Sequence, residues 1–119
     1  MNTYLNGQAQ AETFHLPQLE SEMYGGELYE YYPLGKYIVA APGVCGGRPT
    51  FKYTRLEVSM ILSRLAMGDS VEDILKNYSH SKISTEAILE AIQVARIALL
   101  ELTFPLRDVK KTLPELVAA

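Results

Sequence analysis

Three amphipathic helical patterns follow one another between residues 54 and 103, and they limit the fold of this chain more than any other feature. Each pattern begins at a residue that suits a helix N-cap, namely Thr54, Ser70 and Ser84. Apolar residues then recur at the three- and four-residue spacing that places them on one helix face. They are Val58, Ile61, Leu62 and Leu65 in the first pattern and Val71, Ile74, Leu75 and Tyr78 in the second. Short helices of this kind are stable only when their apolar faces pack together. The sequence therefore predicts a small bundle of three helices.

The first two helices are expected to be short. Thr54 and Glu57 fit a capping box, in which each side chain satisfies a free backbone N–H of the first turn, and Gly68 supplies the end. Ser70 caps the second helix, with Asp73 three residues further on. The second helix spans about two turns, so it depends on its neighbours for stability.

The third helical pattern is longer, and its apolar residues fall on two faces. The first face carries Ile88, Ala91, Ile92, Ala95 and Leu99, and the second carries Leu89, Ile97 and Leu100. A helix that is apolar on two sides usually buries both of them. Because the domain is small, we expect another copy of the chain to cover the second face. The sequence therefore predicts a homodimer with Leu89, Ile97 and Leu100 in its interface.

A short β-ribbon is expected before the helices. The run Lys36–Ala41 is rich in β-branched and aromatic residues, as strands are, and Pro42-Gly43 ends it. A second extended piece covers Pro49 to Tyr53 and is expected to pair with the first. An isolated ribbon is marginal in water, so it must pack on the helices or pair with another chain. The predicted fold class is mainly α: a three-helix, helix-turn-helix-like bundle preceded by a short β-ribbon or arm.

The N-terminal part of the chain is acidic, and the remainder is mildly basic. Residues 1–35 contain five glutamates and no Lys or Arg, whereas the remainder carries 11 basic against nine acidic residues. The stretch from Met1 to about Gly26 has no sustained period, so residues 1–35 are predicted to form an acidic, tyrosine-rich arm. Residues 36–103 are the predicted domain, and residues 104–119 a tail that is either a short helix on the core or a partner-binding segment.

Several classes of function find no support in the sequence. No run approaches the length of a membrane helix, and the first ten residues lack the features of a signal peptide. Cys45 has no second thiol for a disulfide or a metal motif, which favours the cytoplasm and predicts no metal or cofactor. His15 and His80 stand in no recognisable pattern with Cys45. We therefore predict a protein that is not an enzyme and has no catalytic residues.

A stretch of ten residues, Gly46 to Arg55, is the main candidate for binding an anionic partner. It combines paired glycines, a proline, two aromatic rings and three cations, with no acid among them. Arg48, Lys52 and Arg55 are expected to contact phosphate, since basic side chains supply most contacts to a nucleic-acid backbone. In the alternative interpretation, Arg55 pairs with a carboxylate near the start of the first helix.

The second and third helical patterns resemble the two helices of a helix-turn-helix motif, with Ser84 to about Leu100 as the recognition helix. Ser84 and Thr85 would hold a phosphate at its N-terminus, and Gln93 or Arg96 would reach a base edge. Two acidic side chains, Glu86 and Glu90, would repel DNA from the same helix. They favour the alternative of a protein-interaction module without DNA binding.

Three stretches in order, residues 41–58, 65–75 and 83–92, resemble the motifs of domain-of-unknown-function family 433. The likeness covers roughly residues 36 to 100, and it departs at Tyr53, where the family pattern usually has glycine. The resemblance implies a compact, dimeric helix-turn-helix-like bundle. Many members look like antitoxins of type II toxin–antitoxin pairs, which bind a small nuclease-like toxin and their own promoter DNA. The expected function is therefore a non-catalytic, antitoxin-like DNA-binding regulator.

Overall fold

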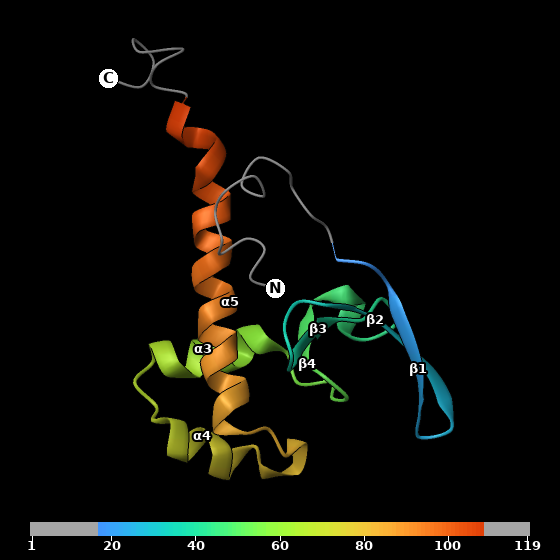
Figure 1. Cartoon of the computed structure of the whole chain (residues 1–119). Coiled ribbons are helices and arrows are strands. Elements are labelled where there is room, and N and C mark those ends of the chain that lie inside the picture. The colour runs from blue at the N-terminus through green and yellow to red at the C-terminus, as the bar shows by residue number, and fades with distance from the viewer. Residues whose placement is uncertain (1–16, 109–119) are drawn as a thin grey trace.

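The computed structural model describes residues 17–108, and within them it contains a four-stranded antiparallel sheet and three α-helices (Figure 1). The strands are β1 (Glu20–Tyr24), β2 (Glu27–Pro33), β3 (Ile38–Ala40) and β4 (Pro49–Phe51). The helices are α3 (Val58–Ala66), α4 (Val71–Asn77) and α5 (Thr85–Thr103), with short 3₁₀ turns at Cys45–Gly47, Ser79–Ser81 and Phe104–Asp108. The prediction of a mainly α fold with a small arm is therefore wrong, because the sheet makes this a mixed α/β fold.

The predicted loose arm contributes two of these strands. β1 and β2 form an antiparallel hairpin whose register joins Tyr24 to Glu27 across the turn. Gly25 and Gly26 both have positive φ, at 62° and 85°, which suits the turn of a tight hairpin. The expectation of a loose segment up to Gly26 is thus wrong for residues 20–26. A Gly-Gly pair between two alternating runs was the local signal for this hairpin.

The predicted β-ribbon is present as β3 and β4, and it joins the hairpin to the helices. β3 pairs with β4 through Ile38 and Phe51, and β2 pairs with β3 through Tyr32 and Ala40. The sheet order is therefore the chain order, β1-β2-β3-β4. Helix α5 packs against β3, and α3 packs against β4.

One hydrophobic core lies where the helices meet β3 and β4. Ile61 of α3, Ile74 of α4 and Ile88 of α5 are completely buried together with Ile38 and Phe51. Each of these three isoleucines belongs to the apolar stripe predicted for its helix. The hairpin packs on a second, smaller cluster around Tyr31 and Val39.

Two of the three predicted helix starts are confirmed. Ser70 Oγ accepts from the Asp73 N–H at 3.0 Å, and Ser84 Oγ accepts from the Ala87 N–H at 3.1 Å. The capping box at the first helix is wrong, because α3 begins at Val58 and Glu57 is its N-cap without a side-chain bond. Glu57 is still extended and forms a β-bridge with Thr50, so the helix starts one turn later than expected.

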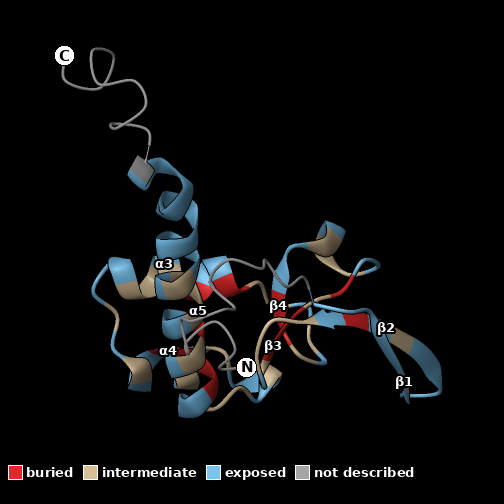
Figure 2. Ribbon diagram, turned by 45° about the horizontal axis from the view of Figure 1, so that its top comes forward, coloured by how far each residue is buried: buried red, intermediate tan, exposed pale blue. Residues whose placement is uncertain are grey.

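Helix α5 has a buried beginning and an exposed end. Ala87, Ile88 and Ala91 are buried, but Ile92 is 42% exposed and Leu99 is 62% exposed. The predicted burial of the whole first face is therefore wrong beyond Ala91. α3 and α4 are short and lie against the beginning of α5, which extends past them, so its second half is mostly exposed (Figures 1 and 2).

The structure describes only the first part of the predicted tail. After α5 comes the turn Phe104–Asp108, and residues 109–119 lie outside the described residues. Among residues 17–108, no helix is long and apolar enough to cross a membrane.

Candidate nucleic-acid interface

The loop that follows β4 forms one wall of the candidate site. Thr54 Oγ1 donates to the Phe51 carbonyl at 2.7 Å and accepts from the Leu56 N–H at 3.0 Å, so the side chain closes the turn itself. The Lys52 N–H donates to the Tyr37 carbonyl at 2.8 Å. Tyr53 has a left-handed backbone with φ of 70°, and its N–H donates to the Tyr29 hydroxyl at 3.1 Å. The wall is therefore fixed by hydrogen bonds on both sides of Tyr53.

The turn between α4 and α5 forms the opposite wall. Lys82 has φ of 55° and closes the turn Ser79–Ser81 by donating its N–H to the Ser79 carbonyl. Ser84 then caps α5 and, together with Glu86 and Ala87 of the first helical turn, lines the space beside this wall. A helix N-terminus with free N–H groups favours anions.

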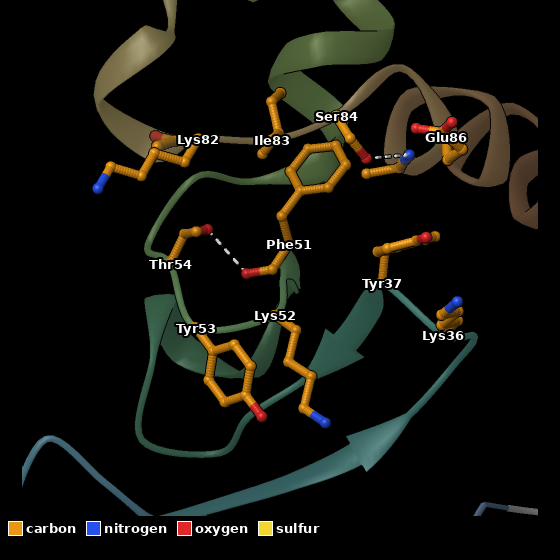
Figure 3. A pocket seen from close by; sticks show the side chains of 12 residues that line it. Lys36, Tyr37, Phe51, Lys52, Tyr53, Thr54, Lys82, Ile83, Ser84 and Glu86 are labelled. Atoms are coloured by element: carbon orange, nitrogen blue, oxygen red, sulfur yellow. Dashed lines mark hydrogen bonds between the residues drawn. The ribbon is translucent and has the colours of Figure 1, made fainter.

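Two adjoining cavities, of about 760 and 540 Å³, lie between these walls and have Lys52, Tyr53, Thr54, Ser81 and Lys82 in common. We call this hollow the basic groove. It runs between residues 51–55 and residues 80–84, and its rim includes Tyr24, Lys36, Tyr37, Glu86 and Ala87. Figure 3 shows Lys82 on one wall and Lys52 with Tyr53 on the other.

Positive charge dominates the lining of the basic groove. Its cations are Lys36, Lys52, Arg55 and Lys82, whereas Glu86 is the single carboxylate among the described lining residues. His80 also lines the groove. A groove that collects one sign of charge concentrates ligands of the opposite sign. The overall charge of the chain is −3, so this groove is a local exception to an acidic protein.

Lys52 is held in place by the hairpin. Its Nζ lies 3.4 Å from Glu22 Oε2, 4.6 Å from the Tyr31 ring centroid and 5.0 Å from that of Tyr53. Partial burial disfavours the charge on Lys52, but contacts with the Tyr31 and Tyr53 hydroxyls outweigh it and raise its pKa. Hydrogen bonds from Tyr53 and Tyr31 and the nearby Lys52 also lower the pKa of Glu22. Lys52 is therefore charged, but part of its charge is already neutralised within the protein.

Four tyrosines surround this pair and join the hairpin to the loop after β4; we call them the tyrosine cluster. They are Tyr24, Tyr29, Tyr31 and Tyr53. The rings of Tyr24 and Tyr53 are stacked, with centroids 4.3 Å apart and planes at 18°. The Tyr53 hydroxyl donates to Glu22 at 2.8 Å, and the Tyr31 hydroxyl donates to the same carboxylate at 2.9 Å. The left-handed backbone of Tyr53 directs its ring into this cluster.

The structure brings only some of the predicted phosphate contacts together. Lys52 and Ser84 line one cavity of the groove, and Lys52 and Arg55 line the other. Thr85 is exposed at the start of α5 but is not in the lining of either cavity. Arg48 lines neither cavity, because it forms a two-bond ion pair with Glu57, at 3.0 Å for each bond. The predicted trio Arg48, Lys52 and Arg55 is therefore not one surface.

The predicted base contacts lie further along α5. Arg96 Nε donates to the Gln93 side-chain oxygen at 2.9 Å, and both residues are exposed. Neither lines the basic groove. Their role in base recognition stays a prediction.

Glu90 does not present a free charge to a ligand, contrary to the expectation that it would repel DNA. Its carboxylate accepts from the Lys36 N–H at 2.8 Å and from the Tyr37 N–H at 2.6 Å. Gly35 gives it room, since a Cβ at that position would come within 2.6 Å of the carboxyl carbon. Glu90 therefore fastens α5 to the start of β3.

Sequence reasoning missed Lys36, Lys82, Tyr24 and His80 as members of the groove. Each comes from a segment distant from residues 51–55, so no local pattern links them. The one available signal was Lys82, which stands two residues before the N-cap Ser84, because a cation there lies close to a helix N-terminus.

The predicted dimer contacts are spread along α5, from Leu89 beside the core residues to Leu100 near the end of the helix. Leu89 is 52% exposed, Leu100 is 47% exposed, and Ile97 is partly exposed. Ile92 and Leu99, which were expected in the core, add to the same uncovered apolar surface. The dimer itself stays a prediction.

The described residues offer little to a catalytic or metal site. No group of three or more His, Cys, Asp and Glu side chains that could hold a metal ion occurs within residues 17–108. Cys45 Sγ donates to the Arg55 carbonyl at 3.3 Å, and Cys45 lines neither cavity of the groove that contains His80.

Comparison with known proteins gives one match. Residues 38–95 match the model of a family described as "Protein of unknown function (DUF433)". No curated protein and no solved structure matches the chain.

Proposed function

We propose, from the premise that residues 38–95 form a domain of the DUF433 family, that this chain is a cytoplasmic, non-catalytic DNA-binding regulator of the antitoxin type that acts as a homodimer. The observation that carries the DNA-binding proposal is the basic groove. There Lys36, Lys52 and Lys82 line one cavity beside the start of α5, and Arg55 lines the adjoining cavity together with Lys52 and Lys82. Glu86 is the sole lining carboxylate in the described part of the chain.

The groove suits a phosphate backbone better than a neutral ligand. Cations supply the sequence-independent part of DNA affinity, and N–H groups at a helix N-terminus add hydrogen bonds to phosphate oxygens. Arg55 and Lys82 line the groove from opposite walls and are exposed, so a phosphate can reach both. Lys52 contributes less, because Glu22 already balances part of its charge.

The arrangement of α4 and α5 supports the same proposal. Two helices joined by a turn, with the second longer, are the elements of a helix-turn-helix motif. With Glu90 bound to backbone N–H groups, Glu86 is the acid nearest to the groove. In this proposal, the start of α5 and its turn contact the backbone, and Gln93 or Arg96 contacts base edges.

Homodimer formation is proposed from the exposed apolar side chains of α5. Leu89, Ile92, Leu99 and Leu100 are each at least 42% exposed on one helix, which is costly in water unless they are covered. A second copy of α5 offers a surface of the same chemistry, as a two-fold interface requires. Sedimentation of a Leu99→Glu/Leu100→Glu variant tests this: we expect a monomer, and a dimer of unchanged stability would contradict it.

DNA binding is tested with duplex DNA from upstream of the gene, measured by fluorescence anisotropy at several salt concentrations. We expect the Arg55→Ala/Lys82→Ala variant to bind more weakly and to show a salt dependence reduced by about 2 in log–log slope, for two lost phosphate contacts. The matched control is Lys76→Ala/Arg107→Ala, which removes the same charge outside the groove. Equal affinities of the two variants would refute the assignment of the groove.

A second function is favoured by one specific observation, the apolar surface of distal α5. In a protein-interaction module without DNA binding, this surface would hold a partner protein such as a toxin. That function predicts no salt-dependent binding of upstream DNA and a stable heteromeric complex. In that case, Leu99→Glu/Leu100→Glu would abolish the complex, whereas Arg55→Ala/Lys82→Ala would leave it intact.

A further inference from the structure

The basic groove has an aromatic wall that contact with a duplex backbone does not require. Tyr24 lines the same cavity as Arg55, His80 and Lys82, although it comes from the tip of the hairpin. Its ring stacks on Tyr53, and the two side chains are 51% and 41% exposed. An exposed pair of stacked rings therefore lies next to cations in one hollow.

Tyr24 joins the hairpin to the loop after β4 through its ring alone. The hydrogen bonds between the hairpin and this loop use Glu22, Tyr29 and Tyr53. Among the side-chain hydrogen bonds of the described residues, none involves Tyr24. Tyr24 adds ring surface to the groove, and half of that surface stays in contact with solvent.

The chemistry of this wall matches one unit of a nucleic acid. Aromatic side chains stack on nucleobases, and every base has a face suited to this. Cations beside the ring can take the phosphates on either side of the stacked base. The bases of a closed duplex are stacked on each other, so only an unpaired base can occupy the ring surface.

We propose that the basic groove binds single-stranded nucleic acid, with an unpaired base stacked on the Tyr24–Tyr53 pair and the adjacent phosphates on Arg55 and Lys82. This inference rests on the proposed phosphate binding by the groove, and it adds a single strand to the duplex DNA of the proposed function as a ligand. The strand enters the groove between residues 51–55 and residues 80–84, where both cations line the same cavity. Tyr53, whose backbone is left-handed, supplies one ring of the pair, and Tyr24 supplies the other.

The chain provides a direct reporter, because it contains no tryptophan. Tyr24→Trp introduces a single indole at the proposed stacking position. We expect its fluorescence to be quenched by an oligothymidylate, whereas an abasic strand of the same length and charge leaves it nearly unchanged. Tyr32→Trp, on a partly exposed tyrosine of β2 outside the groove, is the matched control and is expected to respond to neither strand.

Affinity measurements give the second readout. Loss of one base–aromatic stack costs about 1–3 kcal/mol, so Tyr24→Ala is expected to weaken oligothymidylate binding by roughly 5- to 150-fold. The same substitution should leave binding of the abasic strand unchanged, and Tyr24→Phe should retain wild-type affinity for both. An oligouridylate of the same length distinguishes RNA from DNA as the source of the strand, and either one binding through Tyr24 supports the proposal.

The outcomes separate this inference from the proposed function. If abasic and normal strands bind equally, or if Tyr24→Ala weakens both alike, the stacking proposal is overturned while phosphate binding stands. If Arg55→Ala/Lys82→Ala changes no nucleic-acid affinity, the proposed function fails. Preferential binding of duplex, with no quenching of Trp at position 24, also overturns the single-strand proposal.

Discussion

Two elements project from the core of this molecule, the β1–β2 hairpin and the distal half of α5. The core and these two elements are held in place by different forces. In the core, Ile61, Ile74 and Ile88 meet β3 and β4 with no solvent contact. The hairpin β1–β2 is fixed largely by hydroxyl and charge contacts to Glu22, and the distal half of α5 has few contacts at all. The proposed binding surfaces lie on or beside the projections. The core thus carries two elements, the hairpin and distal α5, whose exposed surfaces are not held in place by core packing.

The core should respond most strongly to truncation. Replacing fully buried Ile88 by alanine removes apolar contacts and leaves a cavity, so Ile88→Ala is expected to lower the free energy of unfolding by about 2–5 kcal/mol. Urea denaturation measures this. A loss below about 1 kcal/mol would mean that the core is not where the structure places it.

The contact between α5 and the start of β3 should rank second. Glu90→Gln replaces a carboxylate that accepts two backbone N–H bonds with an amide that can accept only through its one oxygen, so we expect a loss of about 1–2 kcal/mol in unfolding free energy. Glu86→Gln, at an exposed position on the same helix, is the control and should be neutral. Equal effects of the two would argue against a structural role for Glu90.

The hairpin should respond to acid rather than to core truncation. The pKa of Glu22 is lowered below its ordinary value of 4.5 by hydrogen bonds from Tyr53 and Tyr31 and by Lys52. A lowered folded-state pKa means that Glu22 stabilises the hairpin above pH 4.5 and that this contribution is lost as the pH falls through the lower value. The protection factors of the β1 and β2 amides in hydrogen exchange should therefore fall below that pH, ahead of those of the core amides.

Glu22→Gln is the matched variant for this acid response. We expect its hairpin amides to exchange faster than those of the wild type at neutral pH. In acid, their protection factors should fall less than those of the wild type. If wild type and variant show the same pH profile, another group holds the hairpin.

Distal α5 should show the smallest effect on the folded protomer. Leu99 is 62% exposed, so Leu99→Ala is expected to change the unfolding free energy of the isolated protomer by no more than about 0.5 kcal/mol. The measurement needs protein dilute enough to be monomeric. A loss as large as that of Ile88→Ala would show that this half of α5 is buried in the protomer itself.

Periodicity predicted the helices well because their apolar stripes reflect burial directly. Ile61, Ile74 and Ile88 lie in the core as expected, and Ser70 and Ser84 cap their helices as expected. The pattern could not reveal that Ile92 and Leu99 are exposed, since burial there depends on how far α3 and α4 reach. It also overlooked the β1–β2 hairpin, whose glutamates and tyrosines gain order from contacts with Lys52 and Tyr53, distant in the sequence.

The candidate site was less predictable than the fold, for a related reason. Lys52 and Arg55 could be identified from the basic stretch, and both line the groove. Arg48 could not be separated from them, because its pairing with Glu57 depends on the extended backbone before α3. Lys82 belongs to the turn before α5, and Tyr24 belongs to the hairpin. Only the three-dimensional fold brings these two segments to the groove, so the sequence alone does not show that these residues line it.

The position of β1 at one border of the sheet bears on how copies of this chain can associate. Among the described residues, β1 pairs only with β2, which leaves the backbone of its other side available as a template for a further strand. Glu20 and Glu22 stand on this short strand, and antiparallel pairing with an identical strand would bring such carboxylates from two copies close together. Like charges along an open strand oppose growth of a continuous intermolecular sheet. Glu20 and Glu22 thus disfavour pairing between copies of the chain along this border.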